Sequence, residues 1–208
     1  ELRGRFSAML SSIPLNRYPE PGSPALAARF AKAFGVGRDQ VMIGSGSDEL
    51  IQILCTAVAR PGAEVLIPVP TFAMYRITSQ NAGLTVAAVP LDGMFDLDLA
   101  AMRERIAAYP PALTFLAWPN NPTGNCFSRE RVEAILREWP GIVVVDEAYF
   151  HFSGKTLLPE FNRHENLVIL RTLSKVGFAA MRIGFLIGPP ALVHELDKVR
   201  LPYNLNAM

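Results

Sequence analysis

Apolar residues along the chain are concentrated in short runs that polar segments separate. Seven segments are strand-length and mostly apolar: residues 41–43, 64–68, 84–90, 113–118, 141–149, 166–172 and 183–188. Continuous apolar runs bounded by turn residues are typical of strands buried on both faces. The pattern therefore predicts a sheet that helices cover on both sides.

The segments between these runs predict helices. In residues 48–59 and 128–139 the apolar positions recur at helical spacing. The segment 23–35 has the expected ends, with Ser23 as N-cap, Pro24 in the first turn and Gly35 as a stop. The predicted helices are residues 23–35, 48–59, 70–83, 98–109, 128–139 and 190–200.

The alternation of strands and helices predicts a doubly wound α/β fold, with a mostly parallel sheet and helices on both faces. Such folds bind ligands at the carboxyl ends of their strands. The Pro- and Gly-rich stretch 14–24 predicts an extended arm. We expect an N-terminal arm over 1–22 and one large domain over 23–200. Because no helix or strand is predicted over 201–208, we expect there the start of a link to a further domain.

Composition and charge narrow the classes of protein. Of the 208 residues, 50% are hydrophobic and 19% are charged, which favours a folded core over disorder. The net charge of +1, without a basic block, argues against nucleic acid as a partner. No apolar run approaches the roughly 20 residues of a membrane span, and the first residues lack the apolar core of a signal peptide. We therefore expect a cytoplasmic protein without a membrane partner.

The cysteines and histidines do not indicate a metal site. Cys55 and Cys126 lack metal-ligand spacing and are expected to be free thiols. The three histidines are scattered along the chain. We expect no metal.

Two predicted loops carry residues that suit a phosphorylated ligand. In GSGSDE (44–49) the glycines allow close approach, and the N–H groups of a helix start can hold a phosphate. Ordinary helix capping would explain the same residues. PNNPTG (119–124) places the Asn121 amide at another strand end, although an isolated turn of this kind means little.

Two further strand ends carry charged residues. Asp146 ends a run of buried valines, where a carboxylate is unfavourable unless a protein partner or a cationic ligand group satisfies it. Lys175 is an ordinary surface lysine or, if its charge is disfavoured, a nucleophile towards a carbonyl. Thr172, Ser174 and Arg182 near it suit a phosphate.

Together these groups match the needs of pyridoxal 5′-phosphate, namely a phosphate cradle, an acid for the ring nitrogen, an amide for the ring oxygen and an amine for the aldehyde. The segments RYPEP, GSGSDE, PTFAMY, NNPTG, DEAY and TLSK resemble, in wording and order, the fold-type I aminotransferases, and within them the histidinol-phosphate aminotransferase group. The resemblance extends from about residue 14 to residue 204. It implies the large domain of that fold, without the small C-terminal domain.

The resemblance also implies roles for the residues that contact the cofactor ring. Lys175 would carry the internal aldimine and move a proton, and Asp146 would keep the pyridine nitrogen protonated. Asn121 and Tyr149 would hydrogen-bond the phenolic oxygen. Phe72 would stack on the ring face.

A second set of roles concerns the phosphate. The implied ligands are the N–H groups of Ser47 and Asp48, the hydroxyls of Thr172 and Ser174, and the Arg182 guanidinium. Tyr18 would reach the phosphate of a second subunit, which implies a homodimer with shared active sites.

The sequence departs from the family pattern in two places. Relatives commonly have a small residue after the lysine and the arginine eight positions on, whereas Val176 follows Lys175 here and Arg182 is seven positions away. The family's small domain supplies the arginine that binds the substrate carboxylate or phosphate. The residues that select the substrate are therefore expected outside this chain.

The leading functional expectation is a transaminase of histidine biosynthesis. It would transfer an amino group between L-glutamate with 2-oxoglutarate and histidinol phosphate with imidazole acetol phosphate. An aromatic amino acid aminotransferase and a lyase similar to threonine-phosphate decarboxylase are alternatives, because they share the fold and most motifs. Two non-catalytic alternatives are a cofactor-sensing regulator, although no basic module lies before residue 14, and a nucleotide- or sugar-phosphate-binding domain.

Overall fold

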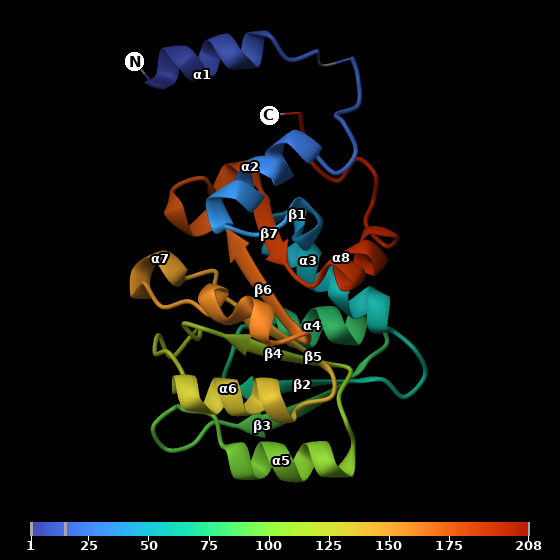
Figure 1. Cartoon of the computed structure of the whole chain (residues 1–208), viewed down its shortest axis with the longest axis vertical. Helices are drawn as coiled ribbons and strands as arrows, with labels where there is room; N and C mark the ends of the chain where they lie inside the picture. Colours follow the sequence, from blue (N-terminus) through green and yellow to red (C-terminus); the bar gives the residue numbers. More distant parts are fainter. Residues whose placement is uncertain (1, 15, 208) are drawn as a thin grey trace.

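The computed structural model describes residues 2–14 and 16–207, and a seven-stranded sheet runs through its centre (Figure 1). The strands are β1 (Val41–Ser45), β2 (Glu64–Val69), β3 (Thr85–Pro90), β4 (Leu113–Ala117), β5 (Ile142–Asp146), β6 (Leu167–Thr172) and β7 (Ile183–Ile187). Their order across the sheet is β1-β7-β6-β5-β4-β2-β3.

All strands but β7 run in the same direction. Strands β3, β2, β4, β5 and β6 pair in parallel, and β7 is antiparallel to both β6 and β1. The carboxyl ends of six strands therefore meet at one edge of the sheet, where β7 begins. We call this the carboxyl edge.

Helices cover both faces of the sheet. The helices of the described residues are α1 (Leu2–Ser11), α2 (Pro24–Phe34), α3 (Gly46–Val58), α4 (Met74–Asn81), α5 (Leu99–Ala108), α6 (Arg129–Glu138), α7 (Phe150–Ser153) and α8 (Pro190–Asp197). Helices α3, α4 and α8 pack on one face, and α2, α5 and α6 pack on the other. The predicted doubly wound, mostly parallel α/β fold is confirmed.

Two predicted helices begin elsewhere, and both differences affect the carboxyl edge. The helix predicted over 48–59 begins at Gly46, directly after β1. The helix predicted over 70–83 begins only at Met74. The Asn120 amide accounts for this delay: its Nδ2 donates to the Pro70 carbonyl at 3.0 Å, and its Oδ1 accepts from the Thr71 hydroxyl at 2.9 Å. Phe72 thus lies on a loop.

Helix α1 was not expected from the sequence, and it lies apart from the sheet (Figure 1). Its side chains over 4–11 are exposed, so no buried apolar face marks it as a helix in the sequence. Residues 16–23 of the predicted arm form neither helix nor strand. Residues 1 and 15 of that arm and residue 208 of the predicted link lie outside the described residues, and the domain boundaries stay a prediction. No helix within the described ranges is long and apolar enough to cross a bilayer.

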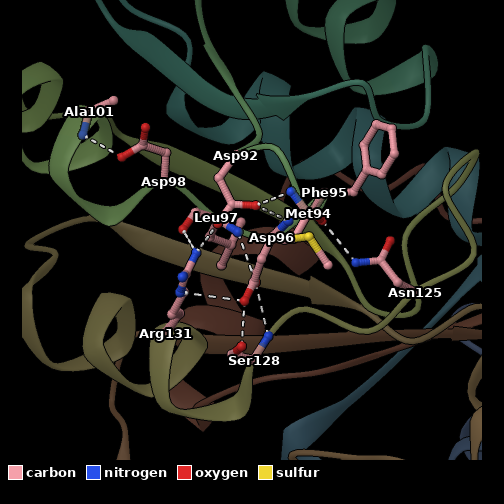
Figure 2. Close-up of polar contacts among 10 residues, drawn as sticks. All are labelled: Asp92, Met94, Phe95, Asp96, Leu97, Asp98, Ala101, Asn125, Ser128 and Arg131. Atoms are coloured by element: carbon pink, nitrogen blue, oxygen red, sulfur yellow. Dashed lines mark hydrogen bonds and ion pairs between the residues drawn. The ribbon is translucent and has the colours of Figure 1, made fainter.

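A polar network holds the loop that follows β3 against the start of α6 (Figure 2). Arg131 Nη1 lies 2.6 Å from Asp92 Oδ2, and the Ser128 amide donates to Asp96 Oδ1 at 3.0 Å. Asn125 Nδ2 donates to the Phe95 carbonyl of the same loop at 2.8 Å. The network therefore fixes the end of the 119–125 turn at the carboxyl edge.

Strand β7 and the start of α3 approach each other without side chains between them. Gly184 pairs with Gly44 of β1 and with Thr172 of β6. A Cβ atom at Gly184 would overlap the backbone of Gly46 and Ser47. Glycine at this position therefore lets the first turn of α3 lie against the sheet.

We expect Gly184→Ala to displace the α3 start and to lower the free energy of unfolding by about 1–3 kcal/mol, the usual cost of overpacking. Urea denaturation measures this change. Gly93→Ala is the control, because a Cβ there meets nothing within 4 Å, and it should change stability by less than about 0.5 kcal/mol. Equal effects of the two substitutions would contradict the close approach.

Candidate active site

The predicted site residues surround one pocket at the carboxyl edge. Its lining consists of Ser47, Asp48, Phe72, Tyr75, Ala117, Pro119, Asn121, Asp146, Ala148, Tyr149, Thr172, Ser174, Lys175 and Arg182. Ten of the eleven predicted site residues are in this set, and Tyr18 is the exception. The lysine amine and the buried carboxylate thus share one cavity, which the cofactor hypothesis requires.

Asp146 is a buried carboxylate at the end of β5, with only 5% of its surface exposed. Its Oδ2 accepts a hydrogen bond from the Tyr75 hydroxyl at 2.7 Å, and its Oδ1 accepts from the Ala148 amide at 3.0 Å. Burial raises the pKa of Asp146 to about 6, although both hydrogen bonds act to lower it. The ionised form is therefore held by neutral donors in a dry environment.

Tyr75 is a member of this site that the sequence did not single out. Its ring is fully buried and stacked on Phe115, with 4.7 Å between the centroids. Burial and the adjacent Asp146 carboxylate raise its pKa well above the ordinary value, so it remains a hydrogen-bond donor. A buried tyrosine hydroxyl needs a hydrogen-bond partner, and this requirement was the signal in the sequence that Tyr75 could belong to a polar site. The sequence cannot say which partner lies there.

The start of α3 forms one wall of the pocket together with Arg182. Gly46 has a φ of +78°, and the Arg182 guanidinium lies where a side chain at Gly46 would be. Arg182 Nη2 is 3.1 Å from Asp48 Oδ2. The site therefore places a half-exposed cation beside the N–H groups of a helix start, as an anion site requires.

Two hydroxyls complete this wall from the end of β6. Thr172 Oγ1 donates to the Ile183 carbonyl at 3.2 Å and lies 3.0 Å from Ser174 Oγ. The Ser174 amide donates to Thr172 Oγ1 at 3.1 Å. These bonds fix both hydroxyls at the side of the pocket where Arg182 lies.

The shorter spacing between Lys175 and Arg182 does not remove Arg182 from the pocket. Gly177 has a φ of +93°, and Arg182 itself has a φ of 52°. Left-handed conformations reverse the chain within few residues. The bend therefore returns to the sheet in time for Arg182 to line the site.

The two neighbouring asparagines of PNNPTG differ in their roles. Asn120 is buried, and its side chain bonds the Pro70 carbonyl and the hydroxyls of Thr71 and Thr123. Asn121 instead lines the pocket. The first amide thus fixes the loops on which Asn121 and Phe72 lie.

Lys175 lies in a short 3₁₀ turn (Ser174–Val176) directly after β6. Its Nζ is 5.1 Å from the centroid of the Tyr149 ring, which follows β5. The two predicted ring contacts therefore come from adjacent strand ends and meet across the pocket.

Glu147 and Arg171 form a buried ion pair next to the site, which the sequence also did not single out. Their side chains are 0% and 11% exposed, and Arg171 Nη2 lies 2.8 Å from Glu147 Oε2. Glu147 also accepts from the Leu157 amide at 2.7 Å and from the Thr156 hydroxyl. Burial raises the pKa of Glu147, and Arg171 opposes that shift. The pair closes the loop over 147–157, which carries Tyr149.

Tyr18 lies outside the pocket and is 79% exposed. Its ring stacks on Tyr203, with 4.5 Å between the centroids. Its predicted role needs a second subunit and stays a prediction. Cys55 and Cys126 are free, and no group of three metal-binding side chains occurs in residues 2–14 and 16–207.

We expect the pH dependence of stability to report the Asp146 carboxyl. Between about pH 4 and pH 6 the unfolded chain releases this proton while the folded protein keeps it, so stability falls as the pH rises. Two pKa units correspond to about 3 kcal/mol. As the pH rises over this range, the free energy of unfolding of Asp146→Asn should therefore increase by up to about 3 kcal/mol relative to that of wild type. A constant loss from one missing hydrogen bond applies at every pH.

Urea denaturation of the cofactor-free proteins at several pH values measures this difference. The comparison isolates Asp146, because the other titrating groups occur in both proteins. A difference that stays constant from pH 4 to pH 7 would contradict the raised pKa.

The comparisons with known proteins agree with this geometry. Histidinol-phosphate aminotransferase 2 of Nitrosococcus oceani is 48% identical over 209 residues, which cover 100% of this chain and 58% of the relative. Histidinol-phosphate aminotransferase of Neisseria meningitidis serogroup B is 45% identical and covers 98% of this chain and 56% of its own length. The chain thus spans less than two thirds of the length of these relatives.

Solved structures share the fold. Histidinol-phosphate aminotransferase from Sinorhizobium meliloti, in complex with pyridoxal-5′-phosphate, superimposes with a TM-score of 0.84 at 25% identity and covers 92% of this chain and 53% of that protein. L-threonine-O-3-phosphate decarboxylase from Porphyromonas gingivalis gives a TM-score of 0.78 at 22% identity, with 92% and 57% covered, and shows the fold alone. The model of the family "aminotransferase class I and II" matches residues 5–208. Because this match covers nearly the whole sequence, the chain belongs to the aminotransferase class I and II family.

Proposed function

We propose that this chain is the pyridoxal-phosphate-binding part of a transaminase of histidine biosynthesis. The enzyme would exchange an amino group between L-glutamate with 2-oxoglutarate and histidinol phosphate with imidazole acetol phosphate. One observation carries the proposal: a single pocket is lined by a lysine amine, a buried carboxylate and the start of helix α3, whose N–H groups can hold an anion. The names and identities of the two curated relatives support the substrate pair.

The residues present fit this cofactor at both of its ends. At one end, Gly46 leaves room for the Arg182 guanidinium beside the α3 start, so that a phosphate there would meet both a cation and the N–H groups of a helix start. At the other end, Asp146 is a carboxylate with two neutral donors, ready for a cationic N–H. The cofactor's two ends, an anionic phosphate and a cationic ring nitrogen, would thus each have a suitable partner in the pocket.

When bound, the cofactor would supply an aldehyde for the amino group and a ring that accepts electrons. Asp146 would hold a proton at the ring nitrogen, and Tyr75 would hold Asp146. Lys175 would supply the amine that holds the aldehyde, by a condensation that releases water, and the same amine would later move a proton. Asn121 and Tyr149 would donate hydrogen bonds to the phenolic oxygen.

The remaining pocket residues would fix the cofactor in place. Phe72 would cover the ring face and exclude water. The phosphate would be bound by Ser47, Asp48, Thr172, Ser174 and Arg182. Arg182 would then exchange its contact with Asp48 for the phosphate, a stronger bidentate partner.

We further propose a cytoplasmic homodimer in which Tyr18 reaches the partner's phosphate. The exposed position of Tyr18 and its stacking on Tyr203 support an arm that is held away from its own pocket. We also propose that residues 1–22 form this arm, that residues 23–200 form the cofactor domain and that the link begins at residue 201.

The alternative function is that of a lyase similar to threonine-phosphate decarboxylase. The observation that favours it is the fold, which the Porphyromonas decarboxylase shares. The 45–48% identity to histidinol-phosphate aminotransferases favours the transaminase. An aromatic amino acid aminotransferase would use the same cofactor pocket.

We expect pyridoxal phosphate to give the protein a visible absorbance band that Lys175→Ala lacks, because no other pocket residue is an amine. Borohydride reduction should attach the cofactor to the peptide that contains Lys175, as mass spectrometry can measure. Turnover in the full-length protein should fall by about 10²-fold or more. Lys155→Ala, an exposed lysine outside the pocket, is the control and should keep the band. A label on another lysine would refute the assignment.

We expect histidinol phosphate and glutamate to bleach the visible band of the full-length protein, and phenylalanine to bleach it less. For each amino group transferred, one molecule of the corresponding oxo product should form. Carbon dioxide release from threonine phosphate measures the lyase alternative. Release of carbon dioxide without formation of an oxo acid would overturn the transaminase proposal, but it would not contradict the assignment of the cofactor pocket.

A further inference from the structure

The turn between β1 and α3 is held from outside the sheet as well as from β7. Strand β1 is an edge strand, so alternate backbone groups face away from β7 and need other partners. Asn204 Nδ2 donates to the Ile43 carbonyl at 3.2 Å, and the Ser45 amide donates to Glu49 Oε2 at 2.6 Å. Two side chains thus satisfy two of the groups at the end of this edge strand.

Glu49 and Asn204 also bind each other, although 155 positions separate them in sequence. Asn204 Nδ2 lies 2.7 Å from Glu49 Oε2. Arg200 Nη1 donates to Asn204 Oδ1 at 3.1 Å, and the Arg200 side chain is only 7% exposed. Arg200 is itself held by Asp197 at 2.8 Å. The Asn204 amide is therefore fixed at both ends, with its donor group towards β1.

This contact lies one turn from the proposed phosphate ligands. Ser45 precedes Gly46, the first residue of α3, and the next two N–H groups belong to Ser47 and Asp48. Gly184 of β7 confines the same turn from the opposite side. Hydrogen bonds weaken steeply when donors move by fractions of an ångström or tilt. The orientation of these two N–H groups thus depends on how firmly the turn is held.

We propose that Glu49 and Asn204 are positioning residues for the cofactor phosphate. They hold the β1–α3 turn, and through it the N–H groups of Ser47 and Asp48, without lining the pocket themselves. This inference rests on the proposed function, which assigns the phosphate to those two amides. It gives the segment 200–204 a part in cofactor binding.

The test compares pyridoxal phosphate with pyridoxal, which has the same ring and aldehyde but no phosphate. Dissociation constants are measured for both ligands by titration of the visible band. Asn204→Ala and Glu49→Ala should each weaken binding of pyridoxal phosphate about tenfold, the usual effect of one well-made hydrogen bond. Pyridoxal binding should change less than about twofold, because Lys175 and Asp146 are untouched.

Three further variants sharpen the test. The double variant should bind pyridoxal phosphate no more than about tenfold more weakly than wild type, because the two side chains act as one unit. Asn162→Ala, an exposed asparagine outside the pocket, should leave both constants unchanged. Glu49→Gln keeps an acceptor oxygen and should weaken the binding of pyridoxal phosphate about threefold, because only the negative charge of the acceptor is lost. This variant replaces Asn204→Ala if circular dichroism shows that the alanine variant does not fold.

Equal weakening of both ligands would overturn the proposal, because it would indicate general damage to the pocket. Unchanged binding of both ligands in the variants would overturn it as well. A wild-type protein that binds neither ligand would instead refute the proposed function.

Discussion

The ionised carboxylate of Asp146, buried at the end of β5, is the constraint on which the site depends. A carboxylate with 5% exposure is unfavourable in the absence of a cation, as its raised pKa of about 6 shows. Tyr75 and the Ala148 amide orient it but carry no charge. The neighbouring residue shows the contrast: Glu147 is as deeply buried and has Arg171 as a cationic partner. In the described part of the chain Asp146 has no ion pair, so a cationic ligand group beside it would stabilise its ionised form.

The fold makes the buried carboxylate part of a pocket, because the ends of neighbouring strands lie at the same edge of the sheet. Three strands that are neighbours in the sheet place Asn121 after β4, Asp146 at the end of β5 and Lys175 after β6. The hydrogen bonds of Asn120 and the Glu147–Arg171 pair then fix the loops that carry Asn121 and Tyr149. The pocket is thus enclosed by fixed loops beside Asn121 and Tyr149. It is more open at Arg182, whose side chain is 45% exposed.

Much of this arrangement could be predicted from the sequence, because apolar runs give strands and polar residues after them mark the carboxyl edge. The residue at which α4 starts could not be predicted, because it depends on a tertiary contact with Asn120, some fifty positions away in the sequence. Tyr75 and Arg171 were missed for a similar reason: their spacing suits a buried helix face and a strand. Their functions depend on partners that only the folded chain brings near. The contact of Glu49 with Asn204 is the extreme case.

The reversed direction of β7 explains why both ends of one short bend line the same pocket. Because β7 is antiparallel to β6, the chain leaves the carboxyl edge at Thr172 and must return to it at Ile183. Ser174 and Arg182 therefore flank the same corner whatever the length of the bend between them. The short bend has left-handed backbone at Gly177 and Arg182, and it returns Arg182 to the same edge. Strand direction, rather than loop length, keeps this cation at the α3 start.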